Sequence, residues 1–284
     1  MKKTTKTMII TVLLVLAASS FAPGFADGTG WEWGIILTAC DADGGYLVVP
    51  SEIDGKPVIG IGKNCFNSNI DIVAVAFPES VRIIGDYAFA LSSLEEVAFD
   101  GDEYLYIGNG AFSGTNVRYV EMPRYVGTIG EGLFDGCTQL ESVALSDYMW
   151  EVPGYMFREC CDSLKSIKLP ESCRSIGELA FYYCAALSEV TWPSELRRIE
   201  ESAFESCHSL ERIELPDQLE YIGENAFCDC RSLSCCRIPE TVRFIADNAF
   251  DGCDSLVLAV TAGSYAEEYA VRLSIPYVIS EEQE

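Results

Sequence analysis

The residues best able to do chemistry in this 284-residue chain are thirteen cysteines and one histidine, His208. Thiolates serve as nucleophiles and zinc ligands, and imidazole serves as a general base, so the spacing of these residues limits what they can do. The cysteines crowd most closely at Cys228, Cys230, Cys235 and Cys236. That spacing lacks the two C-x-x-C arms usual in a structural zinc site. We therefore expect neither a metal nor any other cofactor.

His208 occupies a variable position beside a cysteine, and neither a Ser-His-Asp triad nor a Cys-His pair has a distinctive setting around it. We expect it to lie on the surface. Carboxylate pairs that hydrolyse glycosidic bonds are harder to judge by counting, because the chain holds 44 acidic residues. The sequence predicts a protein that is not an enzyme, with a secreted carbohydrate-active enzyme as an alternative of a different class.

Most of the cysteines follow a repeat. Six stand three residues before a leucine in successive units: Cys137, Cys161, Cys184, Cys207, Cys230 and Cys253. Cys173 and Cys236 replace inward aliphatic residues, and Cys65 replaces the alanine before a phenylalanine. Those left over are Cys40, Cys160, Cys228 and Cys235. We expect the repeat cysteines to be buried thiols, although neighbouring units lie within disulfide reach.

Phenylalanine marks the repeat most clearly, with successive gaps of 23, 23, 22, 23, 24, 23, 23 and 23 residues. It stands at Phe66, Phe89, Phe112, Phe134, Phe157, Phe181, Phe204, Phe227 and Phe250. A period of roughly 20–29 residues that mixes single aliphatic positions with a short turn is typical of a leucine-rich-repeat solenoid. The unit reads A-F-x-x-C-x-x-L-x-x-[IV]-x-[LIFM]-P-x-x-[VL]-x-x-I-G.

This unit resembles the BspA-type leucine-rich repeats of secreted and surface proteins in host-associated bacteria and some mucosal parasites. The resemblance covers about residues 46–279. It implies an α/β solenoid: a right-handed leucine-rich-repeat coil of about nine 23-residue repeats, with a parallel β-sheet on its concave face and capping elements at both ends. It says almost nothing about the ligand.

The beginning of the chain has the layout of a secretory signal peptide, because three lysines precede an apolar run at residues 8–18 and small residues follow. Cleavage is expected near Ala22 or Ala26, so residues 1–26 are assigned to the signal and the protein to a secreted or cell-surface location. Residues 27–57 are expected to form an amino-terminal cap that includes Trp31 and Trp33. The repeats then fill residues 58–260.

Residues 261–284 are expected to close the array. Ser264 is placed to cap a helix there, and Glu267 follows three residues later in capping-box spacing. The net charge of −25 disfavours nucleic acid and, once the signal is removed, we expect no insertion into a membrane. A basic or amine-rich partner fits this charge better.

Alternation within the Leu-x-x-Ile-x-Leu segment predicts a strand whose intervening residues point outward on the concave face. Along the array these outward residues change from small side chains to large polar and aromatic ones. We take the large ones as the candidate binding residues: Tyr119, Glu121, Lys168, Glu189, Thr191, Arg212, Glu214 and Arg237. The alternative is that they only keep the sheet soluble.

Two further rows of charge accompany the repeat. Acidic residues just before the phenylalanine are expected at the amino end of a short helical turn, which favours a carboxylate; they are Asp86, Glu131, Glu178, Glu201, Glu224 and Asp247. Arginines on the outward side of the returning segment are expected to pair with this acidic row or, alternatively, to bind an acidic ligand; they are Arg82, Arg174, Arg197, Arg198 and Arg243.

The function predicted from these features is an exported recognition or adhesion protein that binds a host or neighbouring-cell surface protein or glycan. A rigid, extended, acidic scaffold with variable outward residues suits large contact areas. A structural cell-envelope protein without a fixed ligand is the second reading.

Overall fold

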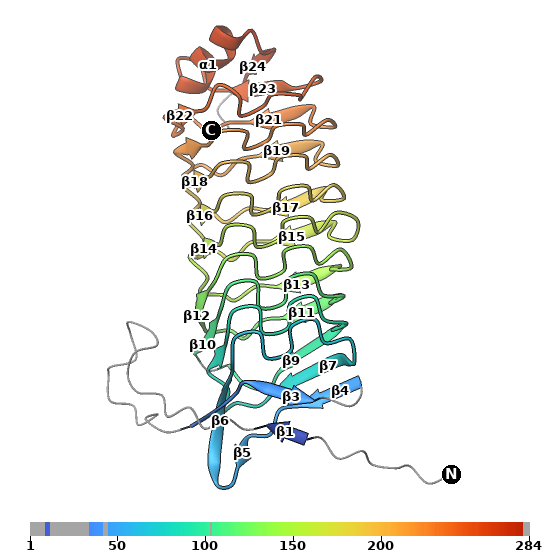
Figure 1. The fold of residues 1–284 in the computed structure, drawn as a ribbon. Coiled ribbons are helices and arrows are strands. Elements are labelled where there is room, and N and C mark those ends of the chain that lie inside the picture. The colour runs from blue at the N-terminus through green and yellow to red at the C-terminus, as the bar shows by residue number, and fades with distance from the viewer. Residues whose placement is uncertain (1–8, 12–33, 42–44, 103, 281–284) are drawn as a thin grey trace.

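The computed structural model shows a β-solenoid of about ten turns with a spacing of about 23 residues, and little helix. Figure 1 shows the turns stacked one upon another, with two columns of strands running along the stack. The structure describes residues 9–11, 34–41, 45–102 and 104–280. Apart from β1 (Ile9–Thr11), which pairs antiparallel with β3 (Ala39–Asp41), the predicted signal peptide lies outside these residues, as do Trp31 and Trp33.

The first strand column contains the Leu-x-x-Ile-x-Leu strand of each repeat, whose alternate residues are predicted to face outward. Neighbouring strands pair in parallel within three ladders. The first ladder contains β4 (Gly45–Val48), β7 (Ile72–Phe77), β9 (Glu96–Phe99), β11 (Tyr119–Glu121) and β13 (Ser142–Ala144). The second contains β15 (Ser166–Lys168) and β17 (Glu189–Thr191), and the third contains β19 (Arg212–Glu214), β21 (Cys235–Arg237), β23 (Val257–Val260) and β24 (Tyr277–Ile279).

The second strand column is formed by the returning segments. One sheet contains β2 (Ile35–Leu37), β6 (Lys56–Ile61), β8 (Ile83–Ile84), β10 (Leu105–Ile107) and β12 (Val126–Ile129), with β5 (Glu52–Ile53) antiparallel to β6. The other contains β14 (Glu151–Val152), β16 (Ser175–Ile176), β18 (Arg198–Ile199), β20 (Tyr221–Ile222) and β22 (Phe244–Ile245). These strands are short because each turn of the coil bends away after two to six residues.

The phenylalanines form a continuous stack between the two strand columns, as the period predicts. Phe181 is fully buried, and its ring lies 5.1 Å from that of Phe157 and 5.0 Å from that of Phe204, measured between centroids. All nine phenylalanines of the repeat are buried. Offset or parallel aromatic pairs at this distance add to the free energy already gained by burying the rings. The stack is therefore the centre of the core.

The segment around each phenylalanine is not the short helical turn expected from the sequence. It is a run of turns in which alternate amides hydrogen-bond to the next coil: Tyr87 N donates to Asn109 O and Phe89 N to Ala111 O, both at 2.8 Å. The residues two before and two after the phenylalanine adopt positive φ, as at Tyr87 (53°) and Leu91 (56°), in every coil except at the position before Phe250. Alternating left-handed residues cannot continue an α-helix, so the acidic row does not lie at helix amino ends.

The carboxyl-terminal end of the array carries α1 (Tyr265–Leu273), the helix expected there. Ser264 caps it, since its hydroxyl accepts a hydrogen bond from Glu267 N at 3.3 Å. The Glu267 carboxylate reaches Gly263 N at 2.6 Å rather than the amide of Ser264. Tyr269 packs edge-on against Phe250 at 6.4 Å and so continues the aromatic stack into the helix.

Candidate binding surface

The outward residues of the first strand column lie in the register expected from the repeat. Tyr119 lies opposite Glu96 on one side and Ser142 on the other, and Glu121 lies opposite Ala144. In later coils Lys168 lies opposite Thr191, Glu189 opposite Ser166, Arg212 opposite Cys235, and Glu214 opposite Arg237. All eight candidate residues thus lie on one column, but they fall in three separate ladders.

Exposure on this surface varies from coil to coil, and in the first strand, β4, Tyr46 is already 61% exposed. Ala74 and Ala76 of β7 are buried, whereas Tyr119 is 61% exposed. The other candidates are exposed too, except Arg237, which is half-buried. The Tyr119 hydroxyl donates to a Glu141 carboxylate oxygen, and this contact raises the pKa of Tyr119 above its ordinary value. The hydrogen bond also orients the tyrosine ring on the sheet.

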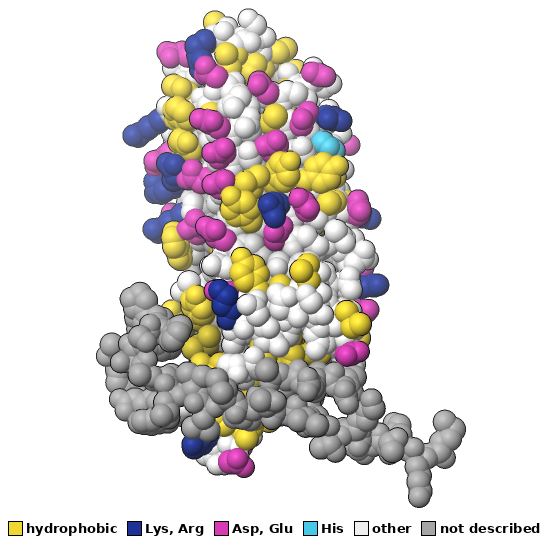
Figure 2. All heavy atoms as spheres, in the orientation of Figure 1, with side chains coloured by type: hydrophobic (Ala, Val, Ile, Leu, Met, Phe, Trp, Pro, Cys, Tyr) yellow, Lys and Arg dark blue, Asp and Glu magenta, His cyan; other side chains and the backbone are white. Residues whose placement is uncertain are grey.

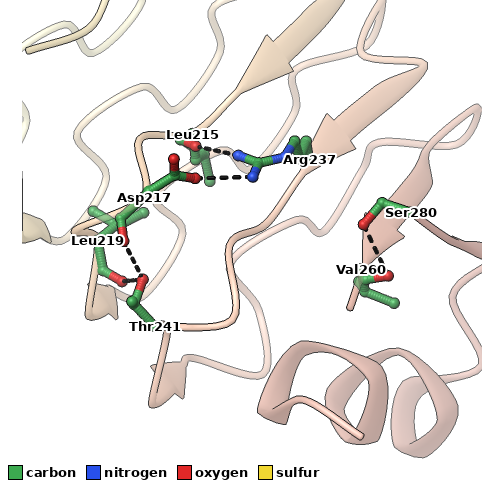
Figure 3. A network of polar contacts seen from close by, with 7 residues as sticks. All are labelled: Leu215, Asp217, Leu219, Arg237, Thr241, Val260 and Ser280. Carbon is green, nitrogen blue, oxygen red and sulfur yellow. Dashed lines mark hydrogen bonds and ion pairs between the residues drawn. The ribbon is translucent and has the colours of Figure 1, made fainter. Parts of the chain in front are cut away.

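Arg237 is the candidate that the structure places differently from the others. Its guanidinium turns toward the loop that follows β19 (Figure 3), where Nη2 lies 2.8 Å from Asp217 Oδ1 and Nη1 lies 3.3 Å from the Leu215 carbonyl oxygen. Thr241 ties the same loop down, because its hydroxyl donates to the Asp217 and Leu219 carbonyl oxygens. Arg237 thus holds the loop after β19 in place, and its guanidinium is less exposed on the outer face of the sheet than the side chains of the other candidates.

The arginine row lies on the second strand column and is partly neutralised there. Arg197 Nη1 lies 2.6 Å from Glu220 Oε1, and Arg198 Nε lies 2.6 Å from Glu200 Oε1. Arg198 also lies over the Tyr221 ring at 4.0 Å. These two arginines therefore pair locally, but with Glu220 and Glu200 rather than with the acidic row expected from the sequence. Partly exposed pairs of this kind contribute little to stability.

The cysteines form a hydrogen-bonded ladder inside the core. Each thiol donates to the carbonyl oxygen of a phenylalanine in the preceding coil at 3.0–3.3 Å. The ladder contains Cys137, Cys160, Cys184, Cys207, Cys230 and Cys253. The assignment of Cys161 to this row was therefore wrong: Cys160 occupies the buried position, and Cys161 is half-buried beside it. The twelve cysteines whose side chains the structure describes are all free thiols.

Burial makes the ladder thiols unreactive. It raises the pKa of Cys137 to about 11 and that of Cys253 to about 12, and it raises the pKa values of Cys160, Cys184, Cys207 and Cys230 well above their ordinary range. A thiol that stays protonated is neither a nucleophile nor a metal ligand. Among the four cysteines within residues 228–236, Cys230 and Cys236 are buried in the core, while Cys228 and Cys235 are half-buried.

His208 is half-buried rather than fully on the surface. Its Nδ1 lies 2.9 Å from the Asp229 carbonyl oxygen, and the Tyr183 ring lies edge-on to it at 5.9 Å. Figure 2 shows hydrophobic side chains gathered just below this histidine in the upper part of the view, and most of the visible carboxylates in the same upper half. Its contacts are those of a residue that ties neighbouring coils together.

Sequence reasoning missed a group of exposed tyrosines on the loops after the first strand column. Tyr125 and Tyr148 stack at 4.9 Å, and Tyr104 lies in the preceding coil with 51% of its surface exposed. A signal was present, because Asp100, Gly101 and Asp102 stand where a proline ends this strand in most other repeats, and the loop here is two residues longer.

The family model described as "BspA type Leucine rich repeat region" matches residues 59–161 and 151–257, in six copies. No curated protein matches the chain. Within the described residues, no helix is long and apolar enough to cross a membrane.

Several solved structures are similar to the chain. One is the pneumococcal vaccine antigen PcpA, 18% identical, covering 81% of this chain and 73% of that one, with a TM-score of 0.49. Another is a leucine rich cell surface protein from Faecalibacterium prausnitzii A2-165, 20% identical, covering 89% and 98%, with a TM-score of 0.43. A third is the leucine rich repeat protein TpLRR of T. pallidum, 24% identical, covering 89% and 94%, with a TM-score of 0.34. The repeat, the ladders of parallel strands and the family match together show that the chain belongs to the BspA-type leucine-rich repeat family.

Proposed function

We propose that this protein is an exported, non-enzymatic recognition protein that binds a protein or glycan on a host or neighbouring-cell surface. The outward face of the first strand column is the binding surface in this proposal. The proposal includes a signal peptide at residues 1–26, an amino-terminal cap at 27–57, repeats at 58–260 and a carboxyl-terminal cap at 261–284. Family membership agrees with a recognition or a structural role.

One observation carries the recognition role. The inward residues of each strand complete the core, so the outward residues are not needed for it. Those of β11, β17 and β19 are large and chemically varied, whereas β13 between them carries Ser142 and Ala144. Tyr119, Arg212 and Glu214 are exposed on strands whose central residues are buried. Exposed tyrosine and arginine anchor interfaces because each combines broad apolar area with hydrogen-bonding groups.

A screen of the purified protein against immobilised extracellular-matrix proteins and a glycan array tests the proposal. Saturable binding supports it, turnover of a glycan supports the carbohydrate-active enzyme, and no binding supports a structural role in the cell envelope. Any partner found is then measured against Tyr119→Ala and Arg212→Ala, which should weaken binding, and Arg237→Ala, which should weaken it less. If only Arg174→Ala and Arg197→Ala weaken binding, the site lies on the second strand column instead.

A further inference from the structure

The carboxyl-terminal end of the array finishes in an edge strand. β24 is the outermost strand of the third ladder, whose order is β19-β21-β23-β24. Figure 1 shows it beside α1 at the end of the stack. Among the described strands, β24 pairs only with β23, so its other edge has no neighbour within the described chain. A strand in this position presents unpaired N–H and C=O groups on which another strand can form a ladder.

The ladder with β23 shows which backbone groups of β24 point away from it. Pro276 O accepts a hydrogen bond from β23, and Ser280 N donates one to β23, both at 2.9 Å. Along a parallel ladder, alternate residues direct both of their backbone groups to the same neighbour, so Val278, midway between these two, also bonds to β23. The N–H and C=O groups of Tyr277 and Ile279 therefore point outward.

The side chains of β24 are apolar and exposed. Tyr277 is 36% exposed, Val278 53% and Ile279 46%, whereas the core-facing residues of β23 are completely buried. No charged residue occurs in the segment 274–280. The terminal unit of a repeat array normally has a polar outer face, and charged side chains normally protect an exposed strand edge. An uncharged apolar edge instead resembles the centre of a protein–protein interface.

We propose that β24 pairs antiparallel with β24 of a second copy of this protein, about a two-fold axis at Val278. In that register Tyr277 lies opposite Ile279 of the second copy, and the reverse pair forms on the other side of the axis. These are the two residues whose backbone groups point outward, so every outward N–H and C=O group gains a partner. A shift of one residue would place outward groups opposite inward ones.

The side chains match in the same register. Tyr277 and Ile279 of opposite copies form aromatic–β-branched pairs, which stabilise antiparallel strands, and Val278 faces its symmetry mate. The Tyr277 hydroxyl lies 3.4 Å from Glu267 Oε1 of α1, which orients the ring before pairing. Two chains of net charge −25 also meet at an uncharged segment, where they repel each other least. β24 is thus complementary to itself, which favours a second copy over an unrelated strand.

The dimer goes beyond the proposed function and does not depend on it. Residues that lie opposite each other in an antiparallel pair project from the same face of the sheet. Val278 continues the outward row through Ala259 and Arg237, so the outward faces of both first strand columns lie on one side of the joined sheet. A ligand repeated on a surface would meet both copies at once, which raises the effective affinity without a new contact.

Sedimentation velocity of the purified full chain tests the dimer. Between about 1 and about 200 µM the protein should shift from monomer to dimer and no further, because pairing uses this edge of each copy. The Kd should fall when NaCl is raised from about 20 to about 300 mM, since salt screens the repulsion between two acidic copies. Ile279→Pro removes an outward N–H group and keeps the bonds to β23, so it should raise the Kd about tenfold.

Substitution of Val278 identifies the partner as a second copy. Val278→Lys places like charges opposite each other across the axis and should raise the Kd about tenfold or more, and Val278→Glu should do the same. An equimolar mixture of these two variants should dimerise again, because opposite charges then face each other. Val73→Lys is the matched control, since this exposed valine lies on β7; it should change the Kd less than about twofold.

Four results would each overturn the proposal. They are a parent protein that stays monomeric over this range, growth to species larger than the dimer, equal effects of Val278→Lys and Val73→Lys, and a mixture of the two Val278 variants that stays monomeric. Thermal unfolding of each variant separates loss of the dimer from loss of the fold. The Val278 mixture needs no such correction, because recovery of the dimer shows that both variants are folded.

Discussion

The thiol of Cys207 donates a hydrogen bond to the carbonyl oxygen of Phe181 at 3.2 Å, across 26 residues of sequence. The same contact recurs between Cys184 and Phe157 and between Cys230 and Phe204. The Phe181 carbonyl already accepts a hydrogen bond from Cys184 N at 3.1 Å, so the thiol adds a second one and pairs its own S–H group inside the core. The repeated cysteine is a structural residue that joins one coil to the coil before it.

The choice between Cys160 and Cys161 gives the first prediction. Cys160 is fully buried and donates to Phe134 O, whereas Cys161 is only half-buried. Burial raises the pKa of both thiols, and raises that of Cys160 far more. Native protein treated with N-ethylmaleimide at neutral pH should be modified at Cys161 and not at Cys160, as read by peptide mass mapping. Equal modification would show that Cys160 is accessible and is not part of the ladder.

The ladder also predicts a loss of stability in alkali. Burial raises the pKa of Cys137 from 9.0 to about 11, so between these pH values the unfolded chain releases a proton that the folded chain keeps. The free energy of unfolding therefore falls as pH rises through this window, by up to about 3 kcal/mol for this thiol. Urea midpoints at pH 7.5 and at about pH 10.5 should differ less in Cys137→Ala than in the parent. In Cys161→Ala, the control, the difference should stay close to that of the parent.

The phenylalanine period predicted both the fold and the strand register. Because every coil must bury the same ring, a fixed spacing also fixes which strand residues face out, and the pairing of Tyr119 with Ser142 confirms this. The repeat spacing predicted the wrong cysteine in one coil. Cys161 stands three residues before Leu164, as the repeat requires, but Cys160 occupies the ladder position. In that coil the extra residue lies after the cysteine, and the ladder position is set by its distance from Phe157.

Other features depend on contacts that no local pattern records. Tyr87 and Leu91 adopt left-handed conformations because hydrogen bonds to the next coil offset the backbone strain. The intrinsic preferences of these two residue types do not predict this conformation. Gly110 and Gly114, at the same places around Phe112, were the available signal. The direction of Arg237 follows from its contacts with the loop after β19, which the repeat does not determine.

Removal of one ring from the phenylalanine stack should be costly. Phe181 is fully buried between two neighbouring rings, and Phe181→Ala should lower the free energy of unfolding by ~3–5 kcal/mol because flanking coils cannot collapse into the cavity. Phe244→Ala is the matched control, since this ring is 43% exposed and stacks only on Tyr221; its cost should stay below about 1.5 kcal/mol. Urea unfolding measures both, and similar costs would contradict the assignment of the core.

The left-handed residues beside each phenylalanine give the last prediction. Gly136 follows Phe134 by two positions at φ +70°, and a Cβ atom there would meet nothing closer than 3.8 Å. Any cost of substitution therefore comes from the backbone, and Gly136→Ala should lower the free energy of unfolding by about 1–2 kcal/mol. Gly136→Asn should cost less, because asparagine tolerates this conformation better than alanine does. If thermal unfolding ranks alanine equal to glycine, the turn relaxes without cost and the alternating left-handed pattern is not what holds the coils in register.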